Sequence, residues 1–188
     1  FVAERAELGE ARETVLGVTI PERPGAFREF CSAIGRRVIT EFNYRLSHRD
    51  QAHIFVGVGT SSKNDATKLS SSLNELGYKT VDLSGSEVAK LHVRHMVGGH
   101  AVDTEHEVLC RFEFPERPGA LMHFLDALGD RWNISLFHYR NHGADFGRVL
   151  AGFEVPKSDR DQFTAFLEQL GYPYHLELES SAYDLFLS

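Results

Sequence analysis

The residues best suited to bind a small molecule lie in a heptapeptide that occurs twice, as PERPGAF at positions 21–27 and as PERPGAL at positions 115–121. Each copy separates a strand-like run from a helix-like run, so its Pro-Gly-Ala turn would expose the free N–H groups of a helix N-terminus. These groups and the helix dipole favour an anion such as the α-carboxylate of an amino acid. Turn chemistry alone fits a plain chain reversal equally well. Two occurrences, each before an apolar-striped helix, favour a ligand site.

Apolar side chains after each turn could meet the aliphatic part of such a ligand. Phe27 and Cys31 hold these positions in the first copy, and Leu121 and Leu125 hold them in the second, each pair one helical turn apart. The same residues could instead form only the core stripe of their helices. The turns and these side chains give the first group of predicted ligand-binding residues: Gly25, Ala26, Phe27, Gly119, Ala120, Leu121 and Leu125.

A second repeated motif reads FNYR in the first copy and FHYR in the second. Its tyrosines, Tyr44 and Tyr139, could place hydroxyl groups beside an amino-acid head group, or lie half-buried on a strand with their hydroxyls in solvent. Asn43 in the first copy is replaced by His138 in the second, so the two sites need not be equivalent. These four residues join the ligand-binding prediction. The arginine that ends each motif is expected in a surface ion pair.

The sequence predicts neither a catalytic centre nor a metal centre. No nucleophile–base pair or carboxylate dyad stands out at catalytic spacing. Cys31 and Cys110 lie among apolar neighbours in different copies and are expected to pack as small hydrophobic side chains. One i, i+3 histidine pair could bind a metal, but no third ligand follows at metal-site spacing. The histidines concerned are His92, His95, His100 and His106.

These candidates are positioned by a tandem duplication of the chain. The heptapeptides are 115 − 21 = 94 residues apart, and the motif LGY also recurs after 94 residues, at 76–78 and 170–172. The FNYR and FHYR motifs are 95 residues apart. The second copy therefore has one extra residue between its first helix and the strand that follows.

Hydrophobic periodicity predicts the same order in both copies: strand, helix, strand, strand, helix, strand. In the first copy a strand over 14–20 ends at Pro21, and an apolar-striped helix begins near Pro24 and ends at Gly35. This β-α-β-β-α-β order predicts an α+β protein with two ferredoxin-like units in tandem. Helices would cover one face of each sheet, leaving the other face to solvent or a neighbour, and the sheets would meet side by side or face to face.

Length and composition describe an ordinary globular protein, with 188 residues, 42% hydrophobic and 25% charged. The net charge of −7 opposes a nucleic-acid partner, and the chain lacks the basic-glycine-aromatic run of RNA-binding ferredoxin-like domains. No apolar run approaches the roughly 18 residues needed to span a bilayer, and no signal peptide precedes the first strand, so a cytoplasmic protein without a membrane partner is expected. The predicted segments are a connector remnant (1–13), the first unit (14–83), a linker with a short helix near 87–96 (84–106), the second unit (107–177) and a C-terminal extension (178–188).

Four segments resemble one known family. They are the turn Glu22–Phe27, the strand Glu41–Arg45, the run KLHVRHMVGG at 90–99 and the run NISLFHYR at 133–140. Together they are similar to the C-terminal regulatory half of biosynthetic threonine deaminase, also called threonine ammonia-lyase, over essentially the whole chain. The resemblance implies two ACT-like subdomains that bind isoleucine as feedback inhibitor and valine as its antagonist in branched-chain amino-acid biosynthesis. The alternative is an ACT-type regulatory module of another amino-acid enzyme, against which the linker run and NISLFHYR argue.

The resemblance also implies partners and further site residues. In that family the enzyme is a pyridoxal-phosphate tetramer that converts threonine to 2-oxobutanoate and ammonia, so a catalytic domain and further copies of the parent chain are expected partners. Positions equivalent to Leu121, Leu125 and Leu128 affect isoleucine control there, which adds Leu128 to the predicted site. None of the five lysines lies in the family's Ser-x-Lys-x-Arg-Gly setting, so this chain is expected to hold no cofactor and no catalytic residue.

Overall fold

The structure is a computed structural model of the 188-residue chain. It describes residues 13–101, 104, 106–115, 117, 119–140, 146–177 and 181–187. Most of the predicted connector remnant at 1–13 lies outside the described residues, and so do parts of the predicted C-terminal extension. Glu116 and Pro118 of the second turn lie outside them too.

The first unit follows the predicted order of elements. Helix α2 begins after Gly25, whose φ of 84° suits a residue without a Cβ, and ends at Gly35. The second helix is capped by Ser62, whose side chain accepts a hydrogen bond from the Asp65 N–H. The elements are β1 (Glu13–Pro21), α2 (Ala26–Ile34), β2 (Ile39–Arg45), β3 (Gln51–Gly59), α3 (Lys63–Glu75) and β4 (Lys79–Asp82).

The second unit repeats this order and adds one short 3-10 helix before its second long helix. Its elements are β5 (Glu107–Pro115), α5 (Ala120–Leu128), β6 (Asn133–Arg140), β7 (Phe146–Glu154), η2 (Lys157–Asp159), α6 (Arg160–Leu170) and β8 (Tyr174–Leu176). Between the units, a π-helical turn η1 (Ala89–Val93) continues into α4 (Arg94–Met96), at the place where the sequence predicts a short helix. A last helix, α7 (Ser181–Phe186), follows the second unit.

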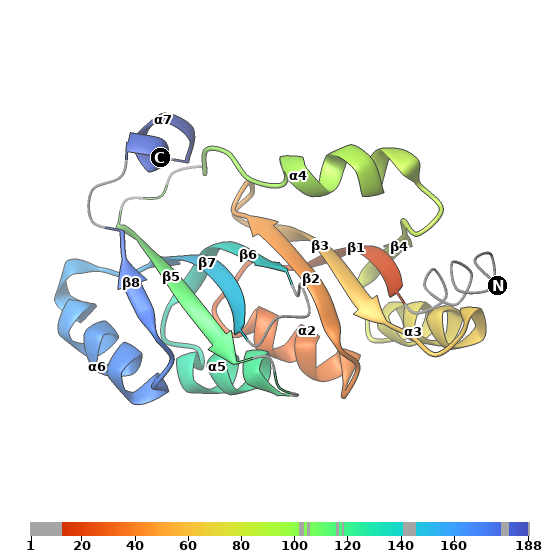
Figure 1. Cartoon of the computed structure of the whole chain (residues 1–188), viewed down its shortest axis with the longest axis horizontal. Helices are drawn as coiled ribbons and strands as arrows, with labels where there is room; N and C mark the ends of the chain where they lie inside the picture. Colours follow the sequence, from red (N-terminus) through yellow and green to blue (C-terminus); the bar gives the residue numbers. More distant parts are fainter. Residues whose placement is uncertain are drawn as a thin grey trace.

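The two units join edge to edge into one eight-stranded sheet, in the order β4-β1-β3-β2-β6-β7-β5-β8 (Figure 1). Strands β2 and β6 form the antiparallel junction, where Asn43 pairs with His138. Because these two residues hold the same position in the repeat, the pairing puts a local two-fold centre between them. Of the two predicted arrangements, the structure has the side-by-side one.

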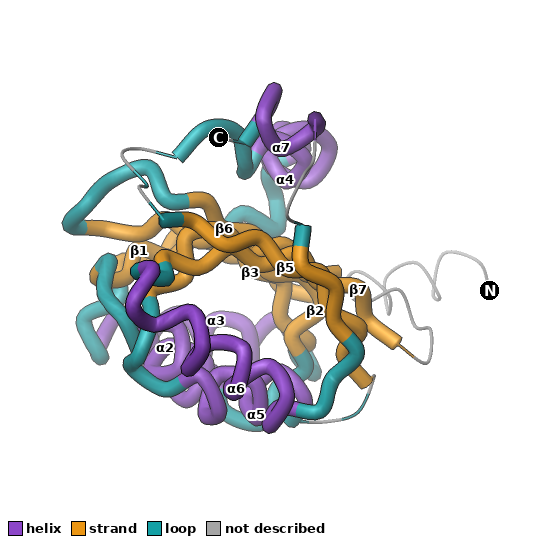
Figure 2. Tube along the Cα trace, turned by 90° about the vertical axis from the view of Figure 1, so that its left-hand side faces the viewer, coloured by secondary structure: helices purple, strands orange, loops and turns teal. Residues whose placement is uncertain are grey.

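Helices α2, α3, α5 and α6 cover one face of the sheet (Figure 2). Their apolar stripes pack against the inward side chains of the strands and form one continuous core, with Phe42 of the first unit and Phe124 of the second both buried in it. Cys31 and Cys110 are buried free thiols, as predicted. The predicted α+β class with two ferredoxin-like units is confirmed.

The linker helix and α7 lie over the opposite face of the sheet (Figure 2). The sequence analysis leaves that face to solvent or to a neighbour, whereas the chain itself covers part of it. Ala89 of η1 packs into a small apolar cluster with Val15 and Phe55. Arg94 lies over the Phe55 ring and forms an ion pair of 2.9 Å with the buried carboxylate of Glu41.

Arg45 departs from the expected surface ion pair. Its guanidinium pairs with Glu107 of the second unit at 2.7 Å, and the two side chains are only 3% and 1% exposed. The same guanidinium donates to the carbonyl oxygens of Gly99 and Leu187, and Tyr183 of α7 donates to Glu107. The prediction is wrong because the linker and α7 fold over this strand and exclude water from the pair.

Candidate functional site

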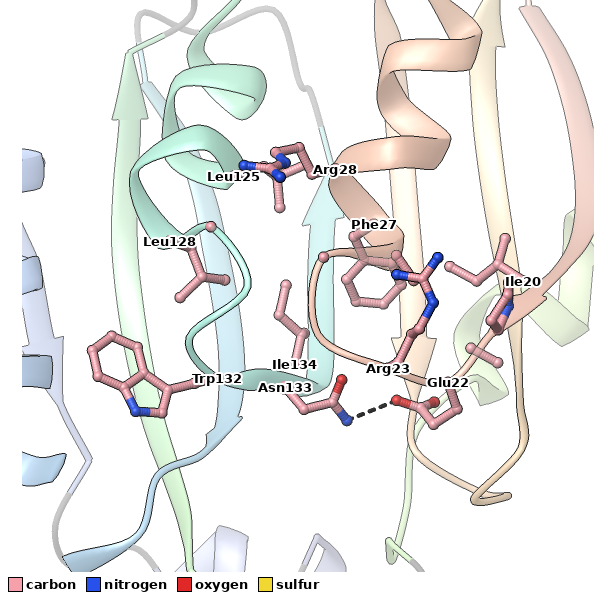
Figure 3. Close-up of a pocket in the computed structure, with 15 residues that line it drawn as sticks. Ile20, Glu22, Arg23, Phe27, Arg28, Leu125, Leu128, Trp132, Asn133 and Ile134 are labelled. Carbon is pink, nitrogen blue, oxygen red and sulfur yellow. Dashed lines mark hydrogen bonds between the residues drawn. The ribbon is translucent and has the colours of Figure 1, made fainter. Parts of the chain in front are cut away.

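A narrow cleft lies between the first turn and the second unit (Figure 3). One side is the turn and start of α2, and the other is the end of α5 with the loop that leads into β6. The cleft is nearly closed in this structure: only about 10 Å³ of it is open to a water-sized molecule, which is room for about one water. Its apolar walls are Ile20, Phe27, Ala52, Leu125, Leu128 and Ile134.

The N-terminus of α2 opens into this cleft. Gly25, Ala26 and Phe27 all line it, and no side chain caps the first turn of the helix. The Ala26 N–H bonds back to the Arg23 carbonyl at 3.2 Å. The nine-residue helix therefore directs backbone donors and the positive end of its dipole toward the space between the units, where the Asp130 carboxylate also lies close to Gly25.

Glu22 forms the polar end of the cleft. Its carboxylate accepts hydrogen bonds from the Tyr44 hydroxyl and from Nδ2 of Asn133, the latter at 2.8 Å (Figure 3). The same Asn133 nitrogen donates to Glu154 at 3.0 Å, so one amide joins carboxylates from both units. Burial raises the pKa of Glu22 and also that of the Tyr44 phenol, which therefore keeps its proton and donates.

Three ion pairs involve residues that line the cleft or the polar basin beside it. Arg23 pairs with Glu29 at 2.7 Å on the first unit. Two further pairs cross between the units: Arg28 with Asp130 at 3.3 Å and Arg49 with Glu154 at 2.9 Å. A wider polar basin, with about 390 Å³ open to water-sized molecules, adjoins the cleft and shares Glu22, Arg23, Trp132 and Asn133 with it.

The structure brings together five of the residues predicted to bind a ligand. Gly25, Ala26 and Phe27 of the first copy face Leu125 and Leu128 of the second across the cleft. The sequence analysis placed these residues in two separate notches, one in each unit. The structure instead builds one cleft from both units.

Tyr44 lies beneath the cleft and contacts it through Glu22, and its side chain is 1% exposed rather than half-buried. Tyr139, its counterpart, is also buried on the helix-covered face. Asn43 and His138 are neighbours of these tyrosines on their strands, and so they lie on the opposite face. Asn43 is buried there and donates to Glu41 at 2.7 Å.

Gly119, Ala120 and Leu121 lie at the second turn, outside this cleft. Gly119 precedes α5 with a φ of 85°, and that helix also has no side-chain cap. The Ala120 carbonyl accepts a hydrogen bond from the Tyr172 hydroxyl at 2.9 Å. Leu121 is partly buried against the core, so its role in ligand binding stays a prediction.

The sequence analysis did not single out Glu22, Trp132 or Asn133. The sequence did contain a signal for Trp132 and Asn133, because the offset between the two copies changes from 94 to 95 residues before the FHYR motif. Ile39 and Ile134 are equivalent, because they pair with Val58 and Phe153, which are themselves 95 residues apart. A register shift follows each pair. Trp132 and Asn133 together therefore stand where the first copy has Val38 alone, and both line the cleft.

No group of three or more potential metal ligands occurs among the residues that the structure describes. The linker histidines His92, His95, His100 and His106 are among these described residues. In the same part of the chain, no helix is long and apolar enough to cross a membrane.

The fold defines a class of protein: two ferredoxin-like, ACT-like units in tandem. Comparison with known proteins identifies the family. A family model for the C-terminal regulatory domain of threonine dehydratase matches residues 4–93 and again residues 98–187. The chain therefore belongs to the family of threonine dehydratase C-terminal regulatory domains.

Similar proteins agree with this assignment. The chain is 53% identical over 188 residues to the L-threonine dehydratase biosynthetic IlvA of Burkholderia multivorans, and 52% identical over 189 residues to that of Escherichia coli. It is 46% identical over 196 residues to the mitochondrial threonine dehydratase of Saccharomyces cerevisiae. All of this chain is covered in each case, but it spans only 37%, 37% and 34% of the relatives' lengths. It corresponds to the regulatory part and does not contain the catalytic part.

Proposed function

We propose that this chain is the effector-binding domain of a threonine dehydratase, with isoleucine as inhibitor and valine as antagonist. The observation that carries the proposal is the cleft, where an uncapped helix N-terminus lies beside aliphatic walls contributed by the other unit. The α-carboxylate of the effector would bind the N–H groups at the start of α2. Its side chain would lie against Phe27, Leu125 and Leu128.

The walls favour isoleucine over valine at this site. Burying a branched aliphatic side chain is worth about 1.5–3 kcal/mol. Valine lacks one methylene group and would lose roughly 1 kcal/mol of that contribution at the same walls. Because the cleft is nearly closed, either ligand would have to move the two units apart to bind there, and so would alter how they pack against each other. An effector controls a distant reaction only to the extent that it binds one state of the protein better than another.

Calorimetry on the purified chain tests this function. Titrations with isoleucine, valine, leucine, threonine and serine should give the tightest binding for isoleucine, weaker binding for valine and the weakest binding for serine. The number of sites per chain follows from the same titrations. Absence of isoleucine binding, or equal binding of isoleucine and serine, would contradict the proposal.

The remaining roles belong to the whole enzyme. We propose that the catalytic part of the dehydratase is the partner of this chain, that the parent protein is a cytoplasmic homo-oligomer, and that pyridoxal phosphate binds the catalytic part. Adding pyridoxal phosphate to the purified chain should then leave the spectrum of the free cofactor unchanged and should not cause threonine consumption. A bound-cofactor spectrum would contradict this division of roles.

A further inference from the structure

The carboxylate of Glu22 differs from the other acidic groups around the cleft. Glu29, Asp130 and Glu154 each pair with an arginine. Glu22 accepts hydrogen bonds from two neutral groups, the Tyr44 hydroxyl and the Asn133 amide, and forms no ion pair within 4.0 Å in the described part of the chain. Glu22 thus lacks a direct ion pair, although Arg49 lies near enough to attract its charge.

This charge is unfavourable in the protein as it stands. Burial has the largest influence on Glu22 and raises the pKa of its carboxyl group, and the attraction of Arg49 does not offset that effect. A carboxylate has about four acceptor positions, so the two hydrogen bonds leave room for more donors. A bound cation with several N–H groups would satisfy both the charge and the unused acceptors.

The position of Glu22 selects the kind of cation that fits. It lies three residues before Gly25, so the carboxylate and the N-terminus of α2 belong to one turn and line one cleft. Glu22 therefore favours a positive group, and the backbone N–H groups at the start of α2 favour a negative group, although the Asp130 carboxylate lies close to that helix start. The zwitterionic head of an α-amino acid carries both groups on one carbon atom.

We propose that Glu22 binds the α-ammonium group of the effector, so that the cleft accepts α-amino acids and rejects keto acids with the same side chain. This inference rests on the proposed binding of an aliphatic amino acid in the cleft. Tyr44 and Asn133 are positioning residues that hold the Glu22 carboxylate in place from two sides. A keto acid would offer no cation to Glu22 and would bring a second negative charge near it.

Calorimetry with a matched ligand pair tests the inference. Isoleucine and 3-methyl-2-oxopentanoate share a side chain and a carboxylate and differ in the ammonium group. The wild-type chain should bind isoleucine at least tenfold more tightly than the keto acid. In Glu22→Gln, isoleucine should bind at least tenfold more weakly, while the keto acid should bind as well as before or better, so the preference should disappear.

A control variant and the alternative outcomes complete the test. Glu75→Gln removes one carboxylate from the exposed side of α3 and should leave both affinities unchanged. Glutamine has nearly the same shape as glutamate and still accepts hydrogen bonds, and near-ultraviolet circular dichroism checks that the fold is intact. Equal wild-type binding of the two ligands would overturn the ammonium role and leave the proposed function standing, and so would an unchanged preference in Glu22→Gln. Failure of wild type to bind either ligand would overturn both.

Discussion

The two turns share six of seven residues but meet different neighbours from the opposite unit. A Cβ built on Gly25 of the first turn would lie 2.3 Å from Oδ1 of Asp130, whereas a Cβ on Gly119 of the second turn would meet no atom of the described residues within 4 Å. Gly25 and Gly119 themselves have nearly the same backbone, with φ of 84° and 85°. The heptapeptide thus determines how each helix starts, and the residues that approach from the other unit determine what surrounds the turn.

The approaching residues differ in charge and in size. The residue after the glycine that ends the first helix is Asp130 in the second unit and Arg36 in the first. Trp132 and Asn133 correspond to Val38 alone. The first turn therefore faces an acid, an indole and an amide, and the counterparts of these groups in the first unit are a base and a small aliphatic side chain.

Replacing Trp132 and replacing its first-copy counterpart Val38 should give the largest difference in stability. Trp132 is 2% exposed and packs against Phe163 and Phe166, whereas Val38 is 56% exposed. Trp132→Ala should lower the free energy of unfolding by about 3–5 kcal/mol, and Val38→Ala should change it by less than about 0.5 kcal/mol. Urea denaturation measures both. Similar losses for the two variants would mean that the two loops contribute equally to packing.

The arginines at the end of the repeated strand motif should differ almost as much. Arg45→Met leaves the buried Glu107 without its cation and should cost about 3 kcal/mol, at the low end for a broken buried pair, because Ser135 and Tyr183 still donate to that carboxylate. Arg140 is 34% exposed and 3.8 Å from Glu41, so Arg140→Met should cost less than about 1 kcal/mol. Chemical denaturation of both variants checks the difference. A larger loss for Arg140→Met would show that Arg45 is not the stronger link between the units.

Replacing either of two leucines of α5 tests which turn binds the ligand. Leu125 lines the cleft at the first turn, and Leu121 lies beside the second. Leu125→Phe should fill the cleft and weaken isoleucine binding more than about tenfold, or 1.4 kcal/mol, while Leu121→Phe should weaken it less than about threefold. Isothermal calorimetry measures both changes, and near-ultraviolet circular dichroism verifies packing. The opposite order would place the effector at the second turn.

The pH dependence of stability should show the smallest effect. Burial raises the pKa of Glu22 above 4.5 in the folded chain, and the titratable groups that face it are Tyr44, Glu154 and Arg49. The folded state then holds this proton more tightly than the unfolded state. The stability contributed by Glu22 is greatest below its unfolded pKa and declines as pH rises through its folded pKa. Glu22→Gln should therefore gain stability relative to wild type as the pH rises from the unfolded pKa through the folded pKa of Glu22, as urea titrations from acid to neutral pH can show. A constant difference across this range would exclude a perturbed Glu22.

Much of the fold could be predicted because its signals are local. The apolar stripes of helices and the turns at Gly25 and Gly119 identify the elements, and the repeat shows that their order occurs twice. The side-by-side junction depends on which strand edges remain open, and the pattern within one unit does not decide that. Burial of the Arg45–Glu107 pair depends on α7, whose residues lie far along the chain from both partners.

The candidate site could be predicted only in part for the same reason. Phe27 and Leu125 are identified by their own helices, but their meeting across one cleft depends on the junction. Asn43 was grouped with Tyr44, although adjacent strand residues point to opposite faces and this alone separates them. His138 pairs with Asn43 at the local two-fold centre, so both residues lie at the junction of the two units. The asparagine-to-histidine difference therefore belongs to the junction and to neither turn.

Strands β2 and β6 join within a single polypeptide, so the two turns can change independently of each other. Two separate copies of one unit, paired through the same edge, would form a symmetric dimer, and every mutation would appear at both sites at once. The linker keeps the two edges at a high effective concentration, so pairing does not depend on protein concentration. Because one gene encodes both units in tandem, each unit also has its own codons. Asp130 and Arg36 could therefore become opposite charges, and one site could specialise while the other kept a purely structural role.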